Sequence, residues 1–507
     1  MDSVSAPDAS AINCYGGLAT LADEHSTVFS PGTFPGHSDY LFFVATRTNL
    51  NSNASGLVVL TGGSGPNANG QWTFDFAPDY GQYAPNAAPG WQNGQIFLTT
   101  MDHDLCPTPL NPPDATFDLN YADPGTVFVD PTNRANKGPG SVVMTYEGTN
   151  RCLGLNRAKV GTNNFFSSIG IATSLDGGHT WPTYAANFVA PPSTNATIGP
   201  YAAEGAMGAN VCMGSDCSTG VPATYGRYSV LTPVVYPQEA NSLSPGGLLT
   251  HVGDSEPSAF VDDVSTSPNQ YVYIVHGYDP GQFACDSGAN CNPSISAPYE
   301  LTSDLTIARG QLNGGTAPLS FTKWYQGGFT QAGRGEDGGG AETPIFSVDP
   351  NGYLNCLAPD QARAMGSISY VQETQQYLLT FVCASPSDPY STSDPANAVN
   401  PNPAQLGAAW FYSTMDAIKS DLSHEDQWSK PLEISGSWSL FANQHNGGPV
   451  GGCFRNYDGW YPTFMSLNHK PGHLSTTGYV FYMNGCTDDT TPNGRRFSSR
   501  TFTITTQ

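Results

Sequence analysis

Residues 256–260 read Glu256-Pro257-Ser258-Ala259-Phe260: an acid, a proline, two small residues and a phenylalanine. Comparable openings stand at four other places along the 507-residue chain. They read Asp123-Pro124…Val127-Phe128, Glu342-Thr343-Pro344-Ile345-Phe346, Tyr461-Pro462-Thr463-Phe464 and, more loosely, His25-Ser26-Thr27-Val28-Phe29. Self-similarity of this kind is the sequence signature of a fold built from repeated units.

A second strand-like run follows each opening, and a tryptophan marks a later hairpin in four of the five units. The second runs cover residues 40–45, 141–146, 271–276, 377–382 and 479–483. The tryptophan corners are Gln71-Trp72, Thr180-Trp181, Lys323-Trp324 and Gln427-Trp428. Four-stranded units arranged radially form a β-propeller. The sequence therefore predicts an all-β protein, a β-propeller with five blades preferred over six, whose last blade is closed by the N-terminal strand.

Helical periodicity is nearly absent, and the best candidate helix covers only residues 414–422. One radial array predicts a single domain over residues 1–507. The openings are spaced more widely than bare blades require, so the units must carry insertions. Stretches rich in Pro, Ser and Asn place these long loops at about 184–250 and 384–406.

The charge balance excludes several classes of partner. There are 18 Lys and Arg against 42 Asp and Glu, which gives a formal charge of −24. Nucleic acids and anionic membrane surfaces are bound through clustered basic residues, which this composition does not favour. No window approaches 18 consecutive apolar residues, so the sequence predicts no membrane span.

The cysteines indicate an oxidising compartment. Eleven Cys in a lysine-poor chain are typical of exported proteins with disulfides. The short spacings suggest local pairs, namely Cys212 with Cys217, Cys285 with Cys291, Cys356 with Cys383, and Cys453 with Cys486. The chain opens Met-Asp-Ser-Val-Ser-Ala, without the features of a signal peptide. We therefore expect a secreted or periplasmic protein from which a signal peptide has been removed.

One hairpin is unusually regular: Ser174-Leu175-Asp176-Gly177-Gly178-His179-Thr180-Trp181. It matches S-x-D-x-G-x-T-W at every fixed position, and a degenerate copy runs from Ser64 to Trp72. In such a turn the Asp accepts backbone N–H groups, Gly takes the positive-φ position and Trp packs back between the sheets. The motif resembles the Asp boxes, or BNR repeats, of sialidases and other propeller proteins. It supports the fold but carries no chemistry of its own.

In a propeller, the starts of the inner strands face the mouth of the central funnel, where a ligand can bind. In this chain those positions read His25, Asp123, Glu256, Glu342 and Tyr461. Three are carboxylates from successive units. Two carboxylates that flank a bond are the requirement for glycoside hydrolysis, one as acid and one as base or nucleophile. A third can raise the pKa of the acid through like-charge proximity.

This arrangement resembles the clan of five-bladed propeller glycosidases that includes arabinanases, arabinofuranosidases and fructosidases. The resemblance implies Asp123 as base or nucleophile, Glu256 as auxiliary carboxylate and Glu342 as general acid. The chain departs from the family pattern in the first unit, where His25 stands beside Glu24. The resemblance implies no required cofactor. It also makes His445 a candidate ligand for an axial Ca²⁺.

Further residues are candidates for binding the saccharide. The ends of the second strands point toward the funnel and carry Arg47, Tyr146, Glu147, His276 and Tyr278. The densest aromatic cluster surrounds Asp458 and includes Trp460 and Tyr461. Aromatic rings could stack on sugar C–H faces, and the intervening acid could bind hydroxyls.

Three other functions compete with a glycoside hydrolase acting on a poly- or oligosaccharide. A sialidase needs three Arg on the substrate carboxylate, for which Arg47, Arg151, Arg334 and Arg455 are available. The Phe/Tyr-Arg-Ile-Pro motif is missing. A polysaccharide lyase would use His276 or Tyr278 beside an Arg. A non-catalytic carbohydrate-binding propeller would rely on its aromatics. For all of these we expect a monomer.

Overall fold

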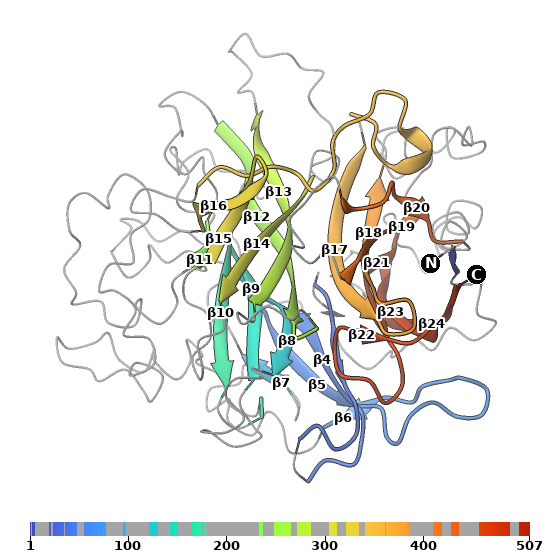
Figure 1. The fold of residues 1–507 in the computed structure, drawn as a ribbon. Coiled ribbons are helices and arrows are strands. Elements are labelled where there is room, and N and C mark those ends of the chain that lie inside the picture. The colour runs from blue at the N-terminus through green and yellow to red at the C-terminus, as the bar shows by residue number, and fades with distance from the viewer. Residues whose placement is uncertain are drawn as a thin grey trace, which may run out of the picture.

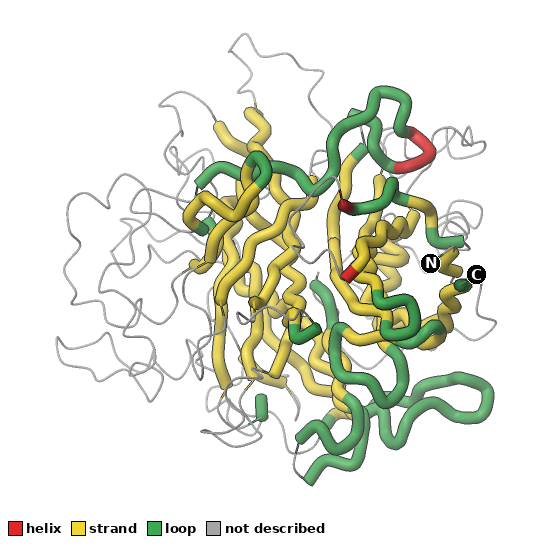
Figure 2. The backbone as a smooth tube through the Cα atoms, in the orientation of Figure 1, coloured by secondary structure: helices red, strands yellow, loops and turns green. Residues whose placement is uncertain are grey.

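The protein is described by a computed structural model, which is almost entirely β-sheet (Figures 1 and 2). The described residues are 1, 3–5, 20–21, 24–34, 36–47, 55–77, 95–97, 121–129, 142–149, 165–174, 177–178, 233–236, 248–264, 271–284, 304–311, 321–333, 340–359, 361–384, 409–417, 427–435, 456–486 and 496–506. In these ranges no α-helix occurs, and η8 (Tyr353–Asn355) is a single 3-10 turn. None of their helices is long and apolar enough to cross a membrane.

The first two blades come from the N-terminal half. In blade 1 the inner edge is shared by two short strands, and so is the outer edge. Its strands are β2 (Thr20–Leu21), β3 (Thr27–Phe29), β4 (Leu41–Arg47), β5 (Ser55–Thr61), β6 (Asp75–Phe76) and β7 (Gln95–Phe97). Blade 2 consists of β8 (Tyr121–Val129), β9 (Val142–Thr149), β10 (Phe165–Ser174) and β11 (Pro233–Val235). β11 lies inside the region expected to be a loop insertion.

Blades 3 and 4 follow the same meander. Blade 3 consists of β12 (Leu248–Asp262), β13 (Tyr271–Ala284), β14 (Asp304–Gln311) and β15 (Phe321–Tyr325), extended by β16 (Gly328–Ala332). Blade 4 consists of β17 (Ala362–Val371), β18 (Gln376–Ala384), β19 (Ala409–Asp416) and β20 (Leu432–Glu433). A short parallel pairing of β10 with β12 joins the sheets of blades 2 and 3.

Blade 5 contains both ends of the chain. It consists of β21 (Asn456–Met465), β23 (Thr477–Cys486), β24 (Arg496–Thr505) and β1 (Ser3–Ser5), while β22 (His473–Leu474) pairs with β17 of blade 4. Ser3 pairs with Thr505 and Val4 with Ile504, so the termini lie together in Figure 1. The prediction of a five-bladed propeller closed by the N-terminal strand is therefore confirmed.

The inner strands share a β-bulge at one level of the repeat. The pairing register shifts between Pro124 and Val127, Ser255 and Ser258, Ala364 and Ser367, and Trp460 and Thr463. The bulge residues Glu256, Met365 and Tyr461 adopt φ of 54°, 56° and 55°. Positive φ in a non-glycine residue costs on the order of 1–3 kcal/mol and persists only where the surroundings enforce it. Blade 2 has Gly125 at this level, where a Cβ would lie 2.4 Å from the carbonyl oxygen of Pro257.

The prediction that Glu342 opens an inner strand is wrong. The inner strand of blade 4 is β17, whose bulge carries Met365 and neither an acid nor a proline. Residues 340–346 form a connecting segment along blade 3, in which the Ile345 N–H donates to the Leu305 carbonyl oxygen at 2.7 Å. Ile345 and Phe346 are buried between blades 3 and 4, so the segment imitates the apolar signal of an opening.

The predicted helix at residues 414–422 is also wrong where the structure describes it. β19 runs through Asp416 and buries Trp410, Phe411 and Tyr412 consecutively, because both faces of this strand are covered. Residues 418–422 lie outside the described residues. A strand buried on both faces shows no period-2 alternation, which removes the usual sign of a strand.

The hairpin and disulfide predictions can be checked in part. Gly177 and Gly178 have φ of 75° and 91°, and the Gly178 N–H donates to Ser174 Oγ at 2.8 Å, while Asp176 and Trp181 lie outside the described residues. In the degenerate copy, Asn67 Oδ1 accepts the N–H groups of Asn69 and Gln71. The disulfide between Cys356 and Cys383 is confirmed.

Candidate functional site

Four carboxylates meet at the propeller axis. Glu24 precedes β3, Asp123 lies in β8, Glu147 in β9 and Glu256 at the bulge of β12. Glu24 is fully buried, Asp123 is 1% exposed and Glu147 is 7% exposed, whereas Glu256 is half-buried. Glu256 is therefore the member of the group that a ligand can reach most easily.

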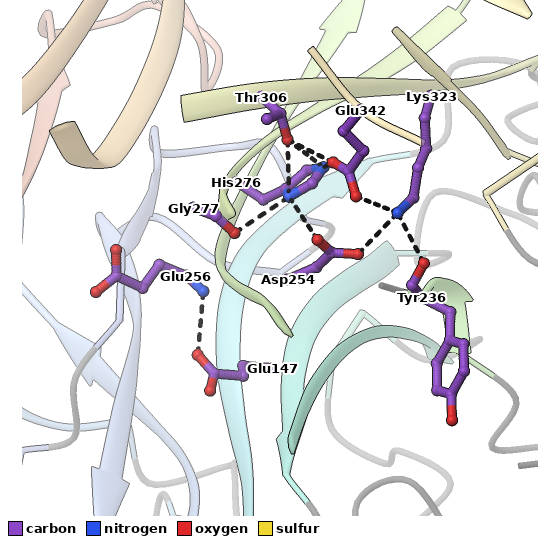
Figure 3. A network of polar contacts seen from close by, with 9 residues as sticks. All are labelled: Glu147, Tyr236, Asp254, Glu256, His276, Gly277, Thr306, Lys323 and Glu342. Atoms are coloured by element: carbon purple, nitrogen blue, oxygen red, sulfur yellow. Dashed lines mark hydrogen bonds and ion pairs between the residues drawn. The ribbon is translucent and has the colours of Figure 1, made fainter. Parts of the chain in front are cut away.

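The carboxylate of Glu256 is held on both oxygens. The Tyr461 hydroxyl donates to Oε1 at 3.1 Å, and the Met365 N–H donates to Oε2 at 3.0 Å. Its own backbone N–H donates to Glu147 Oε2 at 3.0 Å (Figure 3). The side chain is thus oriented by groups from blades 4 and 5, and its backbone is held by blade 2.

The axial group is electrostatically strained. Burial raises the pKa of Glu24 well above its usual value, and the nearby charges of Glu147, Asp123 and Glu256 raise it further. Burial and the same carboxylates raise the pKa of Tyr461. Burial lowers the pKa of His25 to about 3, so its imidazole is neutral at pH 7. Close carboxyl groups that cannot all ionise are typical of sites that transfer protons.

A small polar cavity lies along the axis below these carboxylates. Every blade contributes Ser or Thr residues to its lining, namely Ser26, Thr27, Thr126, Ser258, Ser367, Ser369 and Thr463, and His25 is also part of the lining. The cavity has a volume of about 40 Å³. A water occupies roughly 10–15 Å³ on this measure, so the cavity has room for about three waters.

A second polar cluster is buried within blade 3. Asp254, His276, Thr306 and Lys323 come from its four successive strands, and Glu342 comes from the following segment (Figure 3). The Lys323 ammonium donates to Asp254 Oδ2 at 3.1 Å, to the Tyr236 carbonyl oxygen at 2.7 Å and to Glu342 Oε1. His276 lies between the carboxylates, 3.7 Å from Asp254 Oδ1 and 3.5 Å from Glu342 Oε2.

The charges of the second cluster are balanced internally. Burial raises the pKa of Glu342, but Lys323 and His276 outweigh it and hold that pKa below its usual value. Burial raises the pKa of Asp254, and so does the adjacent Glu342. Burial lowers the pKa of His276 to about 4. Asp254, His276 and Glu342 offer metal-ligand atoms within 4.8 Å of one another, but a cation there would have to displace the Lys323 ammonium.

The structure divides the predicted site residues between these places. Asp123, Glu147, Glu256 and Tyr461 meet at the axis, and Trp460 packs edge-on against Tyr461. Glu342 and His276 belong to the second cluster. Tyr146 is buried in the apolar core between blades 1 and 2. Tyr278 of β13 is half-buried and pairs with Asp254 of β12. Arg47 and Asp458 lie in β4 and β21, but their side chains are outside the description, as is the whole of His445.

Sequence reasoning missed Met365 and Lys323 and left Glu24 without a role. The signal for Glu24 was available, because it directly precedes the opening at His25. Met365 contributes through its backbone N–H and its sulfur, which no residue pattern marks. Lys323 was visible only as the neighbour of Trp324, and its burial depends on strand pairing across the whole of blade 3.

A larger hollow of about 650 Å³ lies away from the carboxylates, at the outer edge of blades 3 and 4. Its lining includes Trp324, Phe346 and Trp428, together with Asp349 and Lys430. Its volume exceeds that of the axial cavity, but its aromatic rings are almost covered, at 3%, 6% and 7% exposed. No residue of the axial carboxylate group lines this hollow.

Comparisons with known proteins show remote likenesses only. No protein-family model and no curated protein matches the chain. Among solved structures, it is similar to an N-acetylgalactosamine deacetylase from F. plautii (11% identity, 98% of this chain, 94% of that chain, TM-score 0.38). It is also similar to an exo-beta-1,3-galactanase from Phanerochaete chrysosporium (12% identity, 96% of this chain, 64% of that chain, TM-score 0.33). A third similar structure is an endo-1,5-alpha-L-arabinanase from Thermotoga petrophila RKU-1 (10% identity, 96% of this chain, 71% of that chain, TM-score 0.35). At these TM-scores the likenesses carry no argument about family or activity.

Proposed function

We propose that the protein is a glycoside hydrolase that cleaves an oligo- or polysaccharide at the axial carboxylates. One observation carries the proposal: three almost fully enclosed acids surround a half-buried fourth, Glu256, which is oriented on both oxygens. Burying several carboxyls close together costs free energy, so their convergence favours a functional site over a purely structural one. Paired carboxyls that differ in environment are what glycoside cleavage needs.

In this proposal Glu256 transfers the proton. A glycosidic oxygen accepts a proton from the Glu256 carboxyl as its bond to the anomeric carbon breaks. Asp123 is the second carboxyl and serves as base or nucleophile, so that water finally supplies the hydroxyl on the anomeric carbon. The pKa of Glu342 is lowered, so an ionised Glu342 is unsuited to the part of general acid.

The axial site supports this proposal better than a lyase. Both ring nitrogens of His276 are engaged inside blade 3, by Gly277, Thr306, Asp254 and Glu342, so the imidazole is not free to act on a polymer. The sialidase alternative depends on arginines whose side chains lie outside the described residues, and it gains no support. We also propose that the protein acts outside the cell as a monomer on a saccharide. The Cys356–Cys383 disulfide supports the extracellular part of that proposal.

The experiment compares product release from arabinan, xylan, a β-1,3-galactan, a uronate polymer and a sialoglycan. Wild type is measured beside Glu256→Gln, Asp123→Asn and the control Glu373→Gln, which changes an exposed acid far from the axis. Reducing ends that are released from one glycan and lost in both axial variants support hydrolysis. Unsaturated uronate products, or full activity in Glu256→Gln, would contradict it.

A further inference from the structure

Glu147 lies at the edge of the axial group but faces the protein with both carboxylate oxygens. It sits in β9, opposite Asp123 in the pairing register, and is 7% exposed. The Ser167 hydroxyl donates to Oε1 at 2.9 Å. The Glu256 N–H donates to Oε2 at 3.0 Å (Figure 3). Because Glu147 is also much less exposed than Glu256, it is poorly placed to bind sugar hydroxyls, which is the role that the sequence suggested for it.

The N–H that Glu147 accepts belongs to a strained residue. Glu256 has a φ of 54° and lies in the register shift between Ser255 and Ser258, where the ladder to β13 is interrupted. A backbone N–H at such a bulge needs an acceptor outside the ladder, because buried donors are almost always paired. Glu147 provides that acceptor from the neighbouring blade.

The same device recurs in the next two blades. The Met365 N–H donates to Glu256 Oε2 at 3.0 Å, and the Tyr461 N–H donates to Met365 Sδ at 3.5 Å. In each case a side chain from one blade accepts the N–H of the positive-φ bulge residue in the following blade. Blade 2 has Gly125 at its bulge and no side chain to offer there, so Glu147 from its second strand makes the link to blade 3.

We propose that Glu147 is a positioning residue, which fixes the backbone of Glu256 and thereby aims the Glu256 carboxyl at the scissile bond. The expected loss of kcat rests on the proposed function, whereas the fixing of the Glu256 backbone by Glu147 does not. It also makes Ser167 part of the support, since the Ser167 hydroxyl holds the other oxygen of Glu147. Glu147 acts through Glu256 and does not contact the saccharide.

The structural test is amide hydrogen exchange in peptides that cover residues 254–260. In Glu147→Ala the Glu256 amide loses its acceptor, and we expect its exchange to rise about tenfold or more, because exchange follows local opening. Glu147→Gln keeps an acceptor oxygen and should stay close to wild type, with Ser167→Ala between them. Glu373→Ala is the control. Unchanged exchange in Glu147→Ala, or equal exchange in the Ala and Gln variants, would overturn the proposal.

The kinetic test separates positioning from substrate binding. Displacing a catalytic group by about 1 Å can cost roughly 100-fold in rate, so Glu147→Ala should lose that factor in kcat with KM nearly unchanged. Glu147→Gln should recover most of kcat, and the alkaline limb of its pH profile should move to lower pH because a neighbouring negative charge is gone. A raised KM with wild-type kcat would instead identify a substrate contact and overturn the proposal.

The two proposals fail in different ways. If wild type hydrolyses no glycan and Glu256→Gln behaves like wild type, the proposed function is wrong. The exchange experiment then still decides whether Glu147 fixes Glu256. If hydrolysis is established and the exchange at residues 254–260 does not respond to Glu147→Ala, only the positioning inference is wrong.

Discussion

The role of a residue in this protein depends on its surroundings more than on its residue type. Three glutamates illustrate this: Glu256 lies at the bulge of β12, Glu147 near the end of β9 and Glu342 in the segment that follows blade 3. Glu256 is half-buried and accepts hydrogen bonds from two other blades, Glu147 accepts two hydrogen bonds from its surroundings, and Glu342 neutralises a buried lysine. Glutamate therefore has three different roles at these three positions.

His25 should make the protein sensitive to acid. Its pKa is about 3 in the fold because of burial, against 6.5 when exposed. The unfolded chain binds a proton below pH 6.5 and the folded chain does not, so stability falls between pH 6.5 and 3 and no further below that. The shift corresponds to about 5 kcal/mol. The urea midpoint of wild type should fall relative to that of His25→Phe as the pH is lowered across this range, because only wild type carries the histidine.

Lys323 should be essential for folding. Its removal leaves Asp254 and Glu342 buried without their cation, which costs about 3–5 kcal/mol when one partner of a buried pair is lost. We expect this loss for Lys323→Met in chemical unfolding at pH 7. Lys430→Met is the matched control, since Lys430 is 73% exposed and lies 3.8 Å from Asp349. Equal effects of the two changes would contradict this account of the cluster.

At the residue scale, the sequence indicated part of the axial site. Asp123, Glu256 and Tyr461 could be predicted because each stands beside a proline at an opening of the repeat. The roles of Glu147 and Met365 could not be predicted, because they depend on which backbone N–H of another blade lies next to each side chain. Such contacts are set by the register between strands that are far apart in the chain.

Among the elements, the inner strands are specialised by their bulges. A bulge interrupts the inner strand at one common level in four of the blades, and in three of them the bulge residue has a positive φ. The apolar residues after it pack between the sheets. The strands could therefore be predicted from their apolar runs. The bulges could not, because an extra residue in one strand is recognised only from its pairing with the neighbouring strand.

Gly125 should be intolerant of any side chain. A Cβ there would lie 2.4 Å from the Pro257 carbonyl oxygen and 3.1 Å from Thr145 Oγ1, so β8 and β12 would have to separate. Gly125→Ala should lower stability by about 1–3 kcal/mol, as overpacking does in a core. Gly328→Ala, whose nearest neighbour is a methyl carbon of Thr330 at 3.3 Å, should have a smaller effect in the same thermal melts. An equally small effect at Gly125 would contradict the close approach.

The whole molecule is a closed ring whose last blade is shared by both ends of the chain. Aromatic residues of blades 1 and 5 pack together where the ring closes. The ring centroid of Phe481 lies 5.0 Å from that of Phe42 and 5.5 Å from that of Trp72. The repeat predicted the ring, but it misassigned one unit. The buried segment at Ile345 imitates an opening, while the true one at Met365 carries neither signal residue.

Closure by β1 should contribute to the stability of the whole ring. Val4 is 1% exposed and pairs with Ile504, so Val4→Asp would bury an unpaired charge at the seam. We expect a loss of about 3 kcal/mol or more, because large losses follow from buried unpaired charges. Ser3→Asp is the control, because Ser3 is exposed. Differential scanning calorimetry that shows the same melting temperature for both variants would contradict the closure.

The central claim is that Glu256 transfers a proton to the leaving group, and one kinetic comparison tests it most directly. Glu256→Gln is assayed on the natural glycan and on an aryl glycoside of the same sugar whose leaving group needs no protonation. Loss of a general acid costs about 10²–10⁴-fold, so we predict that loss on the glycan and little change on the aryl glycoside. An equal loss on both substrates, or no loss on either, would contradict the account.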